Sequence, residues 1–287
     1  MRLQLVVNPA AGGGRGMRAL PKVQAALREH DVIVSPTRSL THADELVAVG
    51  IADDRVVVAM GGDGIAGRVA GQVAALGGVM GVLPGGRGND FCRAVGIPRD
   101  PVAACAVLTS GTVTSIDLGY VDQVAFLGIA SVGFDSDVQE RVLASHVPLH
   151  QLVYLYGSLA AVASWHPARF NCSLDGVGLL LSGWSVAVAN TGVYGGGMRL
   201  APSASLTDGL LDVVAIAATS RSSFLRALPK VFRGTHVGLP SVSVTQARAV
   251  RLDADRPFRV FADGDPVARL PCSVSVKPGA LRVLLPS

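Results

Sequence analysis

The first part of the chain alternates two patterns of apolar residues. Short apolar runs rich in β-branched residues, which are typical of buried strands, occur at residues 3–8, 31–37, 55–60 and 79–84. Segments in which apolar residues recur every three or four positions, as in a helix, lie at 17–30, 42–52, 65–77 and 100–111. Because apolar strands separated by helices form parallel sheets covered on both faces, we predict an α/β domain over residues 1–118.

The pattern changes near residue 118. Strand-like segments punctuated by Gly, Pro, Asn and Asp follow at 115–133, 168–192, 209–218, 241–265 and 272–286. Two helical segments, at 137–146 and 223–234, interrupt them. This order predicts a mostly antiparallel β domain over residues 119–287, whose last strand is a candidate to return to the first domain. No low-complexity linker separates the halves, so we expect the domains to pack directly around a cleft.

Composition changes this picture mainly by what it excludes. Of the 287 residues, 49% are apolar and 16% are charged, with a mean hydropathy of +0.44, so the chain is unusually apolar and far from disordered. No uncharged stretch reaches the ~18 residues of a bilayer span, and the chain begins with a strand-like run rather than a secretory signal. We therefore predict a cytoplasmic protein, at most peripheral on the inner membrane face. The net charge of +4 comes from dispersed basic residues, so we expect no nucleic-acid partner.

Three loops of the first domain share one design: a strand end, several small residues and a following helix. They read NPAAGGGRG from Asn8, GGDGIAG from Gly61 and PGGRGND from Pro84. Glycines allow backbone N–H groups to approach an oxyanion, and the N-terminus of the next helix adds a favourable dipole, so phosphate binding is expected. Glycines in a single loop could equally form a tight turn. Three such loops at strand ends of one sheet favour the phosphate site.

The motif GGDG raises a further question, because Asp63 places a negative charge among these amides. Gly62, Gly64 and Gly67 fit the dinucleotide pattern G-x-G-x-x-G, but Asp63 would then face the pyrophosphate, and no acid follows the next strand. No Walker A motif is present. An aspartate beside a phosphate is favourable when a metal cation lies between them or when it accepts a hydroxyl proton. Both roles indicate phosphoryl transfer from a nucleotide.

Acidic residues of the second domain supply further candidates. Asp263 and Asp265 stand two apart in VFADGDPV, and Asp208 and Asp212 lie on either side of a glycine turn. Asp-Gly is common in hairpin turns, which is the simpler interpretation. A hairpin does not require the second acid, however. Neighbouring carboxylates raise each other's pKa, which suits a general base.

Taken together, these motifs resemble a known family. NPAAGG, GGDG, PGGRGNDF, YGGGMRLAPSASLTDGLLDV and DGD occur here in the order and at the separations of the bacterial diacylglycerol kinase-like lipid kinases, which are related to sphingosine kinases and more remotely to NAD kinases. The resemblance spans nearly the whole chain. It implies an ATP-dependent kinase with an N-terminal Rossmann-like nucleotide-binding domain, a C-terminal antiparallel β-sandwich and an active site between them. The implied acceptor is a lipid alcohol such as diacylglycerol, which would become phosphatidic acid or a similar phospholipid.

The resemblance also implies roles for individual residues. Asp265 would act as the catalytic base with assistance from Asp263, while Asp63 would organise Mg²⁺ at the phosphates. A structural magnesium site is implied at Ser205, Asp208 and Leu210. The implied ATP contacts are Asn8, Pro9, Ala10, Ala11, Gly12, Thr37, Gly61, Gly62, Asp63, Gly64, Ile65, Gly67, Arg68, Gly86, Arg87, Asn89 and Asp90. Members of the family often pair, so a homodimer is a further expectation.

Several positions depart from the family pattern. Ile65 and Gly67 stand where the family usually has Thr and Asn, and Arg68 stands where an acid is common. Arg87 replaces a Thr, and Asp265 is one methylene shorter than the usual Glu. A shift of about 1 Å in a catalytic group can change a rate greatly. Two alternatives therefore stay open: a kinase of the NAD kinase type with a soluble substrate, and a catalytically silent sensor of nucleotide or lipid.

Two sets of residues are candidates for contact with lipid. Apolar residues that could line an acyl path or enter a membrane, or simply form core, are Val147, Leu149, Leu152, Val153, Tyr154 and Leu155. Basic residues at near-helical spacing, which could meet an anionic surface or form a solvated helix face, are Arg221, Arg226, Lys230 and Arg233.

Overall fold

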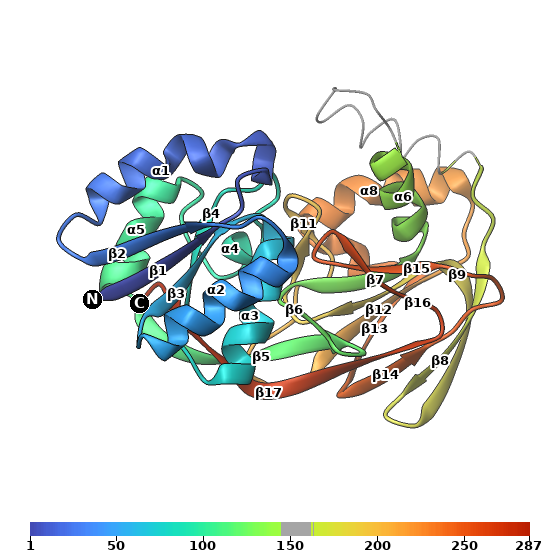
Figure 1. The fold of residues 1–287 in the computed structure, drawn as a ribbon. Helices are drawn as coiled ribbons and strands as arrows, with labels where there is room; N and C mark the ends of the chain where they lie inside the picture. The colour runs from blue at the N-terminus through green and yellow to red at the C-terminus, as the bar shows by residue number, and fades with distance from the viewer. Residues whose placement is uncertain (145–161, 163) are drawn as a thin grey trace.

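The computed structural model describes residues 1–144, 162 and 164–287. It contains an N-terminal α/β domain with parallel strands and a C-terminal, antiparallel β-sandwich-like domain (Figure 1). The predicted fold class is therefore confirmed. The apolar residues from Val147 to Leu155 that were candidates for lipid contact lie outside the described residues. No helix in the described part of the chain is long and apolar enough to cross a membrane.

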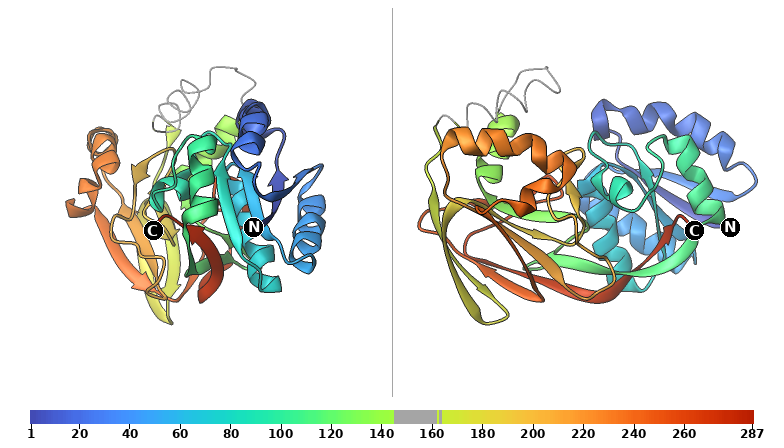
Figure 2. Two further views of the ribbon diagram at one scale, coloured as in Figure 1. Left: turned by 90° about the vertical axis from the view of Figure 1, so that its left-hand side faces the viewer. Right: turned by 180° about the vertical axis from the view of Figure 1, so that it is seen from behind.

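The N-terminal domain is built on four parallel strands in the order β4, β3, β1, β2. Their bounds are β1 (Arg2–Val7), β2 (Asp31–Pro36), β3 (Val56–Gly61) and β4 (Met80–Pro84). The helices are α1 (Arg15–Ala26), α2 (Leu40–Ala52), α3 (Asp63–Leu76), α4 (Asp90–Ala94) and α5 (Pro101–Ser110). Helices α1 and α5 pack together, as do α2 and α3, with the sheet between the two pairs (Figures 1 and 2). A short 3₁₀ helix, η1 (Ala11–Gly13), follows β1.

Local sequence signals account for several helix ends in this domain. The Ser39 side chain accepts a hydrogen bond from the His42 N–H at the start of α2. Asp100 does the same for Ala103 at the start of α5, which has a proline in its first turn. Helix α3 ends at Gly77, which adopts the left-handed conformation that favours glycine.

The second domain contains the remaining strands. They are β5 (Thr112–Val121), β6 (Val124–Phe126), β7 (Ile129–Gly133), β8 (Ala168–Leu174), β9 (Val177–Ala189), β12 (Leu211–Ala217), β13 (Val242–Ala247), β14 (Ala249–Leu252), β15 (Arg259–Ala262), β16 (Asp265–Arg269) and β17 (Cys272–Leu285). Strands β10 (Val193–Tyr194) and β11 (Met198–Arg199) form a separate short hairpin. In β8 the buried and exposed positions alternate, as expected when one face of a strand covers a core. In the described part of this domain the helical elements are α6 (Phe134–Ala144), α8 (Arg221–Arg233) and the 3₁₀ helix η2 (Thr235–Gly238).

Strand β17 joins the two domains. It pairs with β14 and β5, and Val283 near its end pairs in parallel with Met80 of β4. Strand β17, red in Figure 1, therefore runs from the second domain into the first. In the described residues the backbone hydrogen bonds form one continuous 15-stranded sheet. This continuity limits the freedom of the domains to move apart at this edge.

An aromatic cluster fixes α6 and α8 to the sheet of the second domain. Phe134 of α6 packs edge-on against Phe224 of α8, with ring centroids 4.9 Å apart. Phe224 in turn stacks on Trp184 of β9, at a centroid distance of 3.9 Å. These rings are buried together, so α6 and α8 have fixed positions relative to each other.

Candidate active site

The three glycine loops meet at the carboxyl ends of β1, β3 and β4. The Gly85 N–H donates to the Gly61 carbonyl at 2.7 Å. A Cβ added to Gly86 would stand 2.4 Å from the Gly62 Cα. Gly12 has a φ of +58°, and a Cβ there would stand 2.6 Å from the Gly85 carbonyl oxygen. The loops therefore touch backbone to backbone, at distances that only glycine allows.

Two asparagines that we expected at the nucleotide shape these loops with their side chains. Asn8 Oδ1 accepts from the Ala10 N–H at 3.0 Å. Asn89 is buried at a φ of +50°, and its amide bonds both ways to Gly86: Oδ1 accepts from the N–H at 2.8 Å and Nδ2 donates to the carbonyl at 3.2 Å. Arg15 also donates to the Gly86 carbonyl, at 3.1 Å. Both asparagines thus set the loop conformation, whatever else they contact.

The remaining residues expected at the nucleotide lie around the same strand ends. Pro9 and Ala10 connect β1 to η1, and Ala11 is the first residue of η1. Thr37 follows β2, and its N–H donates to the Val7 carbonyl at 2.7 Å, which holds it beside the end of β1.

Asp63 and Asp90 are two carboxylates that lie close to each other at this edge. Asp63 is the first residue of α3, and its Oδ1 accepts from the Phe91 N–H at 3.1 Å. Burial, followed by the charge of Asp90, raises the pKa of Asp63 to about 6. Burial also raises the pKa of Asp90, both of whose oxygens accept from the Gly196 N–H at 3.0 Å. Asp90 therefore links the third loop to the β10–β11 hairpin of the second domain.

The DGD motif forms the turn between β15 and β16. Asp263 has a φ of +52° and is held by two backbone donors: the Leu127 N–H to Oδ2 and the Gly128 N–H to Oδ1, both at 2.8 Å. Burial is the largest cause that raises the pKa of Asp263 to about 7, and the charge of Asp63 adds to it. Both oxygens of Asp263 are occupied, so its carboxylate fixes the turn.

Asp265 differs from Asp263 because its side chain reaches solvent and has no hydrogen bond or ion pair among the described residues. Burial of part of the side chain raises its pKa. Its carboxylate lies against the first turn of α3: a Cβ on Gly64 would stand 1.8 Å from Asp265 Oδ2. The structure thus brings Asp63, Asp263 and Asp265 together from two domains.

Small residues on one face of α3 make this approach possible. Gly64, Gly67 and Gly71 follow one another at intervals of about one helical turn. A Cβ on Gly67 would stand 2.8 Å from Asp263 Oδ2, and one on Gly71 would stand 2.8 Å from the Ala125 Cβ. Gly67, which replaces the family's asparagine, therefore lies where the two domains pack.

Two other departures from the family pattern also have structural explanations. Ile65 points into the core of the first domain, and its Cγ2 would be 2.4 Å from a Cβ on Gly61. The Arg68 guanidinium pairs with Asp44 of α2, where Nε donates to Oδ1 at 2.7 Å and a second nitrogen bonds Oδ2. Its charge is thus already balanced by a neighbouring helix. Arg87 is exposed, with no salt bridge in the described residues.

The expected magnesium site lies in the turn before β12. Asp208 is exposed; its Oδ1 accepts from the Leu210 N–H at 3.0 Å, and its Oδ2 lies 3.4 Å from the Gln246 amide nitrogen. Ser205 Oγ accepts from the Thr207 N–H at 3.3 Å. The described residues contain no cluster of three or more His, Cys, Asp or Glu suited to a metal. A cation here would depend on carbonyl oxygens and a single carboxylate.

Sequence reasoning missed Asp117, which organises this turn. Its buried carboxylate accepts from the Gly209 N–H at 2.7 Å and from the Gly279 N–H at 2.8 Å. It therefore connects the turn before β12 to the bend in β17. A single aspartate in a strand-like run carries no motif that could have revealed this.

Sequence reasoning also missed a polar pair between α6 and the β10–β11 hairpin. Burial raises the pKa of Asp135 to about 6, and a hydrogen bond from Tyr194 opposes this shift. Asp135 Oδ2 is buried and has no hydrogen-bond partner among the described residues. Burial and the charge of Asp135 hold the pKa of Tyr194 well above its usual value.

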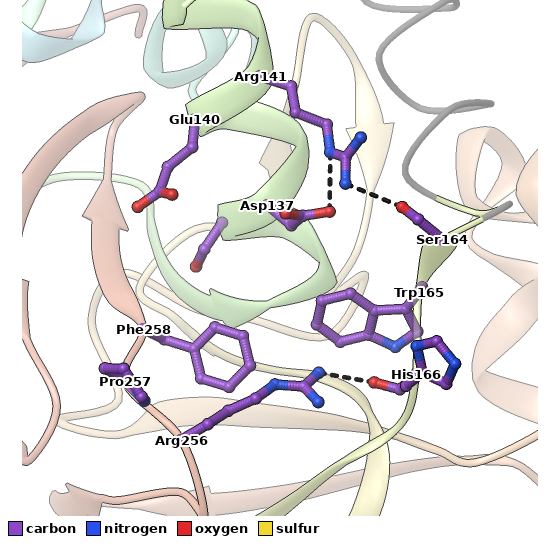
Figure 3. A pocket seen from close by; sticks show the side chains of 10 residues that line it. Asp137, Glu140, Arg141, Ser164, Trp165, His166, Arg256, Pro257 and Phe258 are labelled. Atoms are coloured by element: carbon purple, nitrogen blue, oxygen red, sulfur yellow. Dashed lines mark hydrogen bonds and ion pairs between the residues drawn. The ribbon is translucent and has the colours of Figure 1, made fainter.

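A cavity of about 360 Å³ lies beyond the other end of β15 (Figure 3). The Arg256 guanidinium stacks over Trp165 and Phe258, 5.0 and 5.1 Å from the ring centroids. Arg141 pairs with Asp137 at 3.0 Å. Figure 3 shows these side chains gathered around the cavity. Arg141 is paired with Asp137, and Arg256 is engaged by the two rings and by the His166 carbonyl, so we assign this cavity no role in phosphate chemistry.

The pKa shifts predict how the stability of the metal-free protein depends on pH. Asp63, Asp135 and Asp263 have folded-state pKa values of about 6, 6 and 7, above their ordinary value of 3.8. A raised acid pKa means that the folded state prefers the protonated form, so these groups stabilise fully below pH ~4 and this stability is lost as the pH rises to ~7. We expect a lower melting temperature at pH 7.5 than at pH 5.5 in thermal scans without metal. A melting temperature that rises over this interval would contradict the assignment.

Both domains of the chain match models of known protein families. Residues 2–121 match the diacylglycerol kinase catalytic domain, and residues 128–285 match the YegS C-terminal NAD kinase beta sandwich-like domain. The protein therefore has the two-domain architecture of this class of kinases. More particularly, the chain belongs to the diacylglycerol kinase-like lipid kinase family, as the motifs indicated.

Individual relatives support this assignment. The chain is 32% identical to a diacylglycerol kinase from Mycobacterium tuberculosis, over 99% of this chain and 95% of that one. It is 35% identical to a probable lipid kinase YegS-like from Pseudomonas aeruginosa, over 85% of this chain and 80% of the relative. A crystal structure of a putative diacylglycerol kinase from Bacillus anthracis has a TM-score of 0.83 at 21% identity, covering 99% of this chain and 95% of that one. This last similarity shows the shared fold.

Proposed function

We propose that the protein transfers the γ-phosphate of ATP to the hydroxyl group of a lipid alcohol, such as diacylglycerol, giving phosphatidic acid or a similar phospholipid. One observation carries the proposal. The Asp265 carboxylate of the second domain lies against Gly64 of the GGDG motif, in the first turn of α3 in the first domain. A candidate base and a candidate phosphate site therefore face each other across the domain boundary.

The nucleotide is expected on the three glycine loops. Their backbones converge, and α1 and α3 begin within the first and second loop segments, so N–H groups and positive helix ends gather at one place. Such a site suits a triphosphate. The exposed Arg87 in the third loop could add a cation to it.

The residues at this site also fit a divalent cation. The negative charge of Asp90 adds to burial in raising the pKa of Asp63. Arg93 pairs with Asp90, and its Nε lies 3.8 Å from Asp90 Oδ1. Carboxylate oxygens are the ligands that Mg²⁺ prefers. Bound Mg²⁺ would neutralise charge on the phosphates. Asp63 would hold it, and Asp90 would support this while fixing the β10–β11 hairpin.

Asp265 is the residue proposed to act as the base. The acceptor oxygen would bond to the γ-phosphorus as the bond from that phosphorus to the β,γ-bridging oxygen breaks, which releases ADP. The hydroxyl proton would pass to Asp265, whose raised pKa suits this task. Asp263 would position the turn through its two backbone hydrogen bonds. This arrangement assigns different roles to the two acids of the DGD motif.

The test is transfer of label from [γ-³²P]ATP to a panel of acceptors. Diacylglycerol, a sphingoid base and a polyprenol would be supplied in mixed micelles, and NAD would be supplied as a soluble acceptor. Label in a lipid with the wild-type protein, and none with Asp265→Asn, would support the proposal. Label in NAD alone would show a soluble-substrate kinase. ATP binding without transfer to any acceptor would show a sensor, and either result would overturn the proposal.

Gly64→Ala tests the position of Asp265 without changing its chemistry. The added methyl group would stand 1.8 Å from Asp265 Oδ2, so the carboxylate has to move. Because the carboxylate ends a side chain that reaches solvent, we expect the melting temperature to change little. We expect phosphoryl transfer to fall by about 10²-fold, as misplacement of a catalytic group can cause. Rates and thermal unfolding would be measured for both proteins.

Gly178→Ala is the matched control, because a Cβ at Gly178 meets nothing within 4 Å. This variant should keep the wild-type rate. Full activity in Gly64→Ala would show that the observed position of Asp265 is not required.

A further inference from the structure

Helix α8 carries apolar residues on two faces. Phe224 and Val231 are buried against the second domain. Leu225, Pro229 and Phe232 lie four and then three positions apart, which places them on one stripe of a second, exposed face. Leu225 is 37% exposed and Phe232 is 57% exposed. An exposed phenylalanine in such a stripe is not needed for the fold of the domain, so it indicates an interaction.

Positive charges flank this apolar stripe. They come from Arg221, Arg226, Lys230 and Arg233, all exposed. No Asp or Glu occurs from residue 213 to residue 252. In the described part of the chain no salt bridge joins these four side chains to an acid; Arg221 donates to the Trp165 carbonyl at 3.2 Å and Arg226 to the Ser222 carbonyl at 3.2 Å. The charge of this surface is thus not neutralised from within.

The surface continues past the end of the helix. Pro229, Lys230, Phe232, Arg233 and Thr235 line a hollow of about 470 Å³. Val237 in η2 is also partly exposed. Apolar and cationic groups therefore alternate across one continuous area, which we call the α8 surface: residues 221, 225, 226, 229, 230, 232, 233, 235 and 237.

We propose that the α8 surface docks on an anionic lipid bilayer. Phe232 and Leu225 would enter the interfacial layer, and the flanking arginine and lysine side chains would bind lipid phosphates. A helix with aromatic and leucine residues beside Lys and Arg has the composition of helices that lie in a membrane interface. Each cation near an anionic surface adds attraction, which salt screens.

Charge and apolarity favour this occupant over two others. A second copy would place cations opposite cations if the α8 surfaces paired with each other, which is unfavourable. Nucleic acid would use the cations, but it would leave the exposed Leu225 and Val237 without apolar partners. Only the lipid interface uses both kinds of group.

The location of the surface fits the chemistry of the candidate site. Helix α8 packs against β11 of the β10–β11 hairpin. The same hairpin contributes Gly196, whose N–H bonds to Asp90 beside Asp63. The β10–β11 hairpin therefore connects α8, where the bilayer would bind, to the site where a lipid alcohol is proposed to react. The docking itself does not depend on the proposed kinase function.

Vesicle sedimentation without nucleotide tests the docking. We expect the full-length protein to sediment with vesicles of phosphatidylcholine mixed with phosphatidylglycerol, and to stay in solution with phosphatidylcholine alone. High salt should weaken the binding. The double variants Leu225→Ser/Phe232→Ser and Lys230→Glu/Arg233→Glu should each lose affinity at least about tenfold. Leu180→Ser, at an 81% exposed leucine of β9, is the matched control and should bind like the wild type.

Several results would overturn the docking. One is failure of the wild-type protein to bind anionic vesicles, and another is binding that does not depend on salt. A loss of vesicle affinity in Leu180→Ser equal to that of the double variants would also overturn it, as would tight binding to an oligonucleotide that vesicles do not displace. Thermal unfolding of each variant checks that the fold is kept, and the salt dependence of the wild-type protein tests the proposal even if a variant unfolds. Transfer to acceptors in neutral micelles should be unchanged in both double variants. Vesicle binding without lipid phosphorylation would contradict the proposed function but would still support the docking.

Discussion

Asp265→Asn is expected to lower γ-phosphate transfer by about 10²–10⁴-fold, the range that a positioned general base contributes. Asparagine keeps the size of the side chain but cannot accept the hydroxyl proton. The Asp265 side chain reaches solvent and has no hydrogen bond or ion pair in the described residues, so the melting temperature should change little. Initial rates with the labelled lipid acceptor, together with thermal unfolding, measure both quantities. A wild-type rate would remove Asp265 from the mechanism.

Asp263→Ala separates the roles of the two acids. Removal of this carboxylate leaves the Leu127 and Gly128 N–H groups without their acceptor, and each unpaired buried donor costs about 1–3 kcal/mol. We therefore expect Asp263→Ala to lower the melting temperature clearly, whereas Asp265→Asn should not. A stable but inactive Asp263→Ala variant beside an active Asp265→Asn variant would show that the roles are exchanged.

The order of strands and helices could be predicted from the sequence because long apolar runs and regular spacing are strong signals. The elements that were missed are short. Helix α4 has five residues, and each strand of the β10–β11 hairpin has two, so neither shows a period. Yet both lie at the candidate site, where Asp90 and Gly196 join them.

The candidate site shows a similar limit. The glycine loops could be recognised one by one, but their contact depends on the sheet that aligns β1, β3 and β4. The DGD turn reaches α3 only after the chain has passed through most of the second domain, and no local pattern encodes that approach. Asp117 and Asp135 lie outside any motif, and only their buried positions identify them.

Tertiary packing also explains the departures from the family pattern better than loss of function does. Gly67 removes an asparagine side chain at the point where Asp263 meets α3, with 2.8 Å between an added Cβ and Oδ2. Ile65 fills the core of the first domain. Neither substitution removes the backbone N–H groups on which phosphate binding is expected to depend. These two positions therefore do not by themselves favour a silent sensor.

Asp63→Asn is expected to abolish most activity and yet to stabilise the metal-free protein. The pKa of Asp63 is raised from 3.8 to about 6, mainly by burial and then by Asp90, so the ionised carboxylate costs roughly 2–3 kcal/mol above pH 6. Asparagine is neutral and can still accept from the Phe91 N–H. We expect a higher melting temperature at pH 7.5, and a transfer rate at least about 10²-fold lower, because charge stabilisation at the phosphates is lost.

The pH dependence makes this prediction specific. Near pH 4 Asp63 is protonated in the folded state, so the gain in melting temperature should shrink as the pH falls from 7.5 to 4. Asp54→Asn makes the same chemical change at an exposed turn with a φ of +54°, which asparagine also adopts, and should alter neither property. A destabilised Asp63→Asn variant, or a gain that persists at pH 4, would show that Asp63 is a structural residue. A variant that is more stable at pH 7.5, gains little at pH 4 and transfers phosphate far more slowly would show that the charge of Asp63 is kept for phosphate chemistry at a cost in stability.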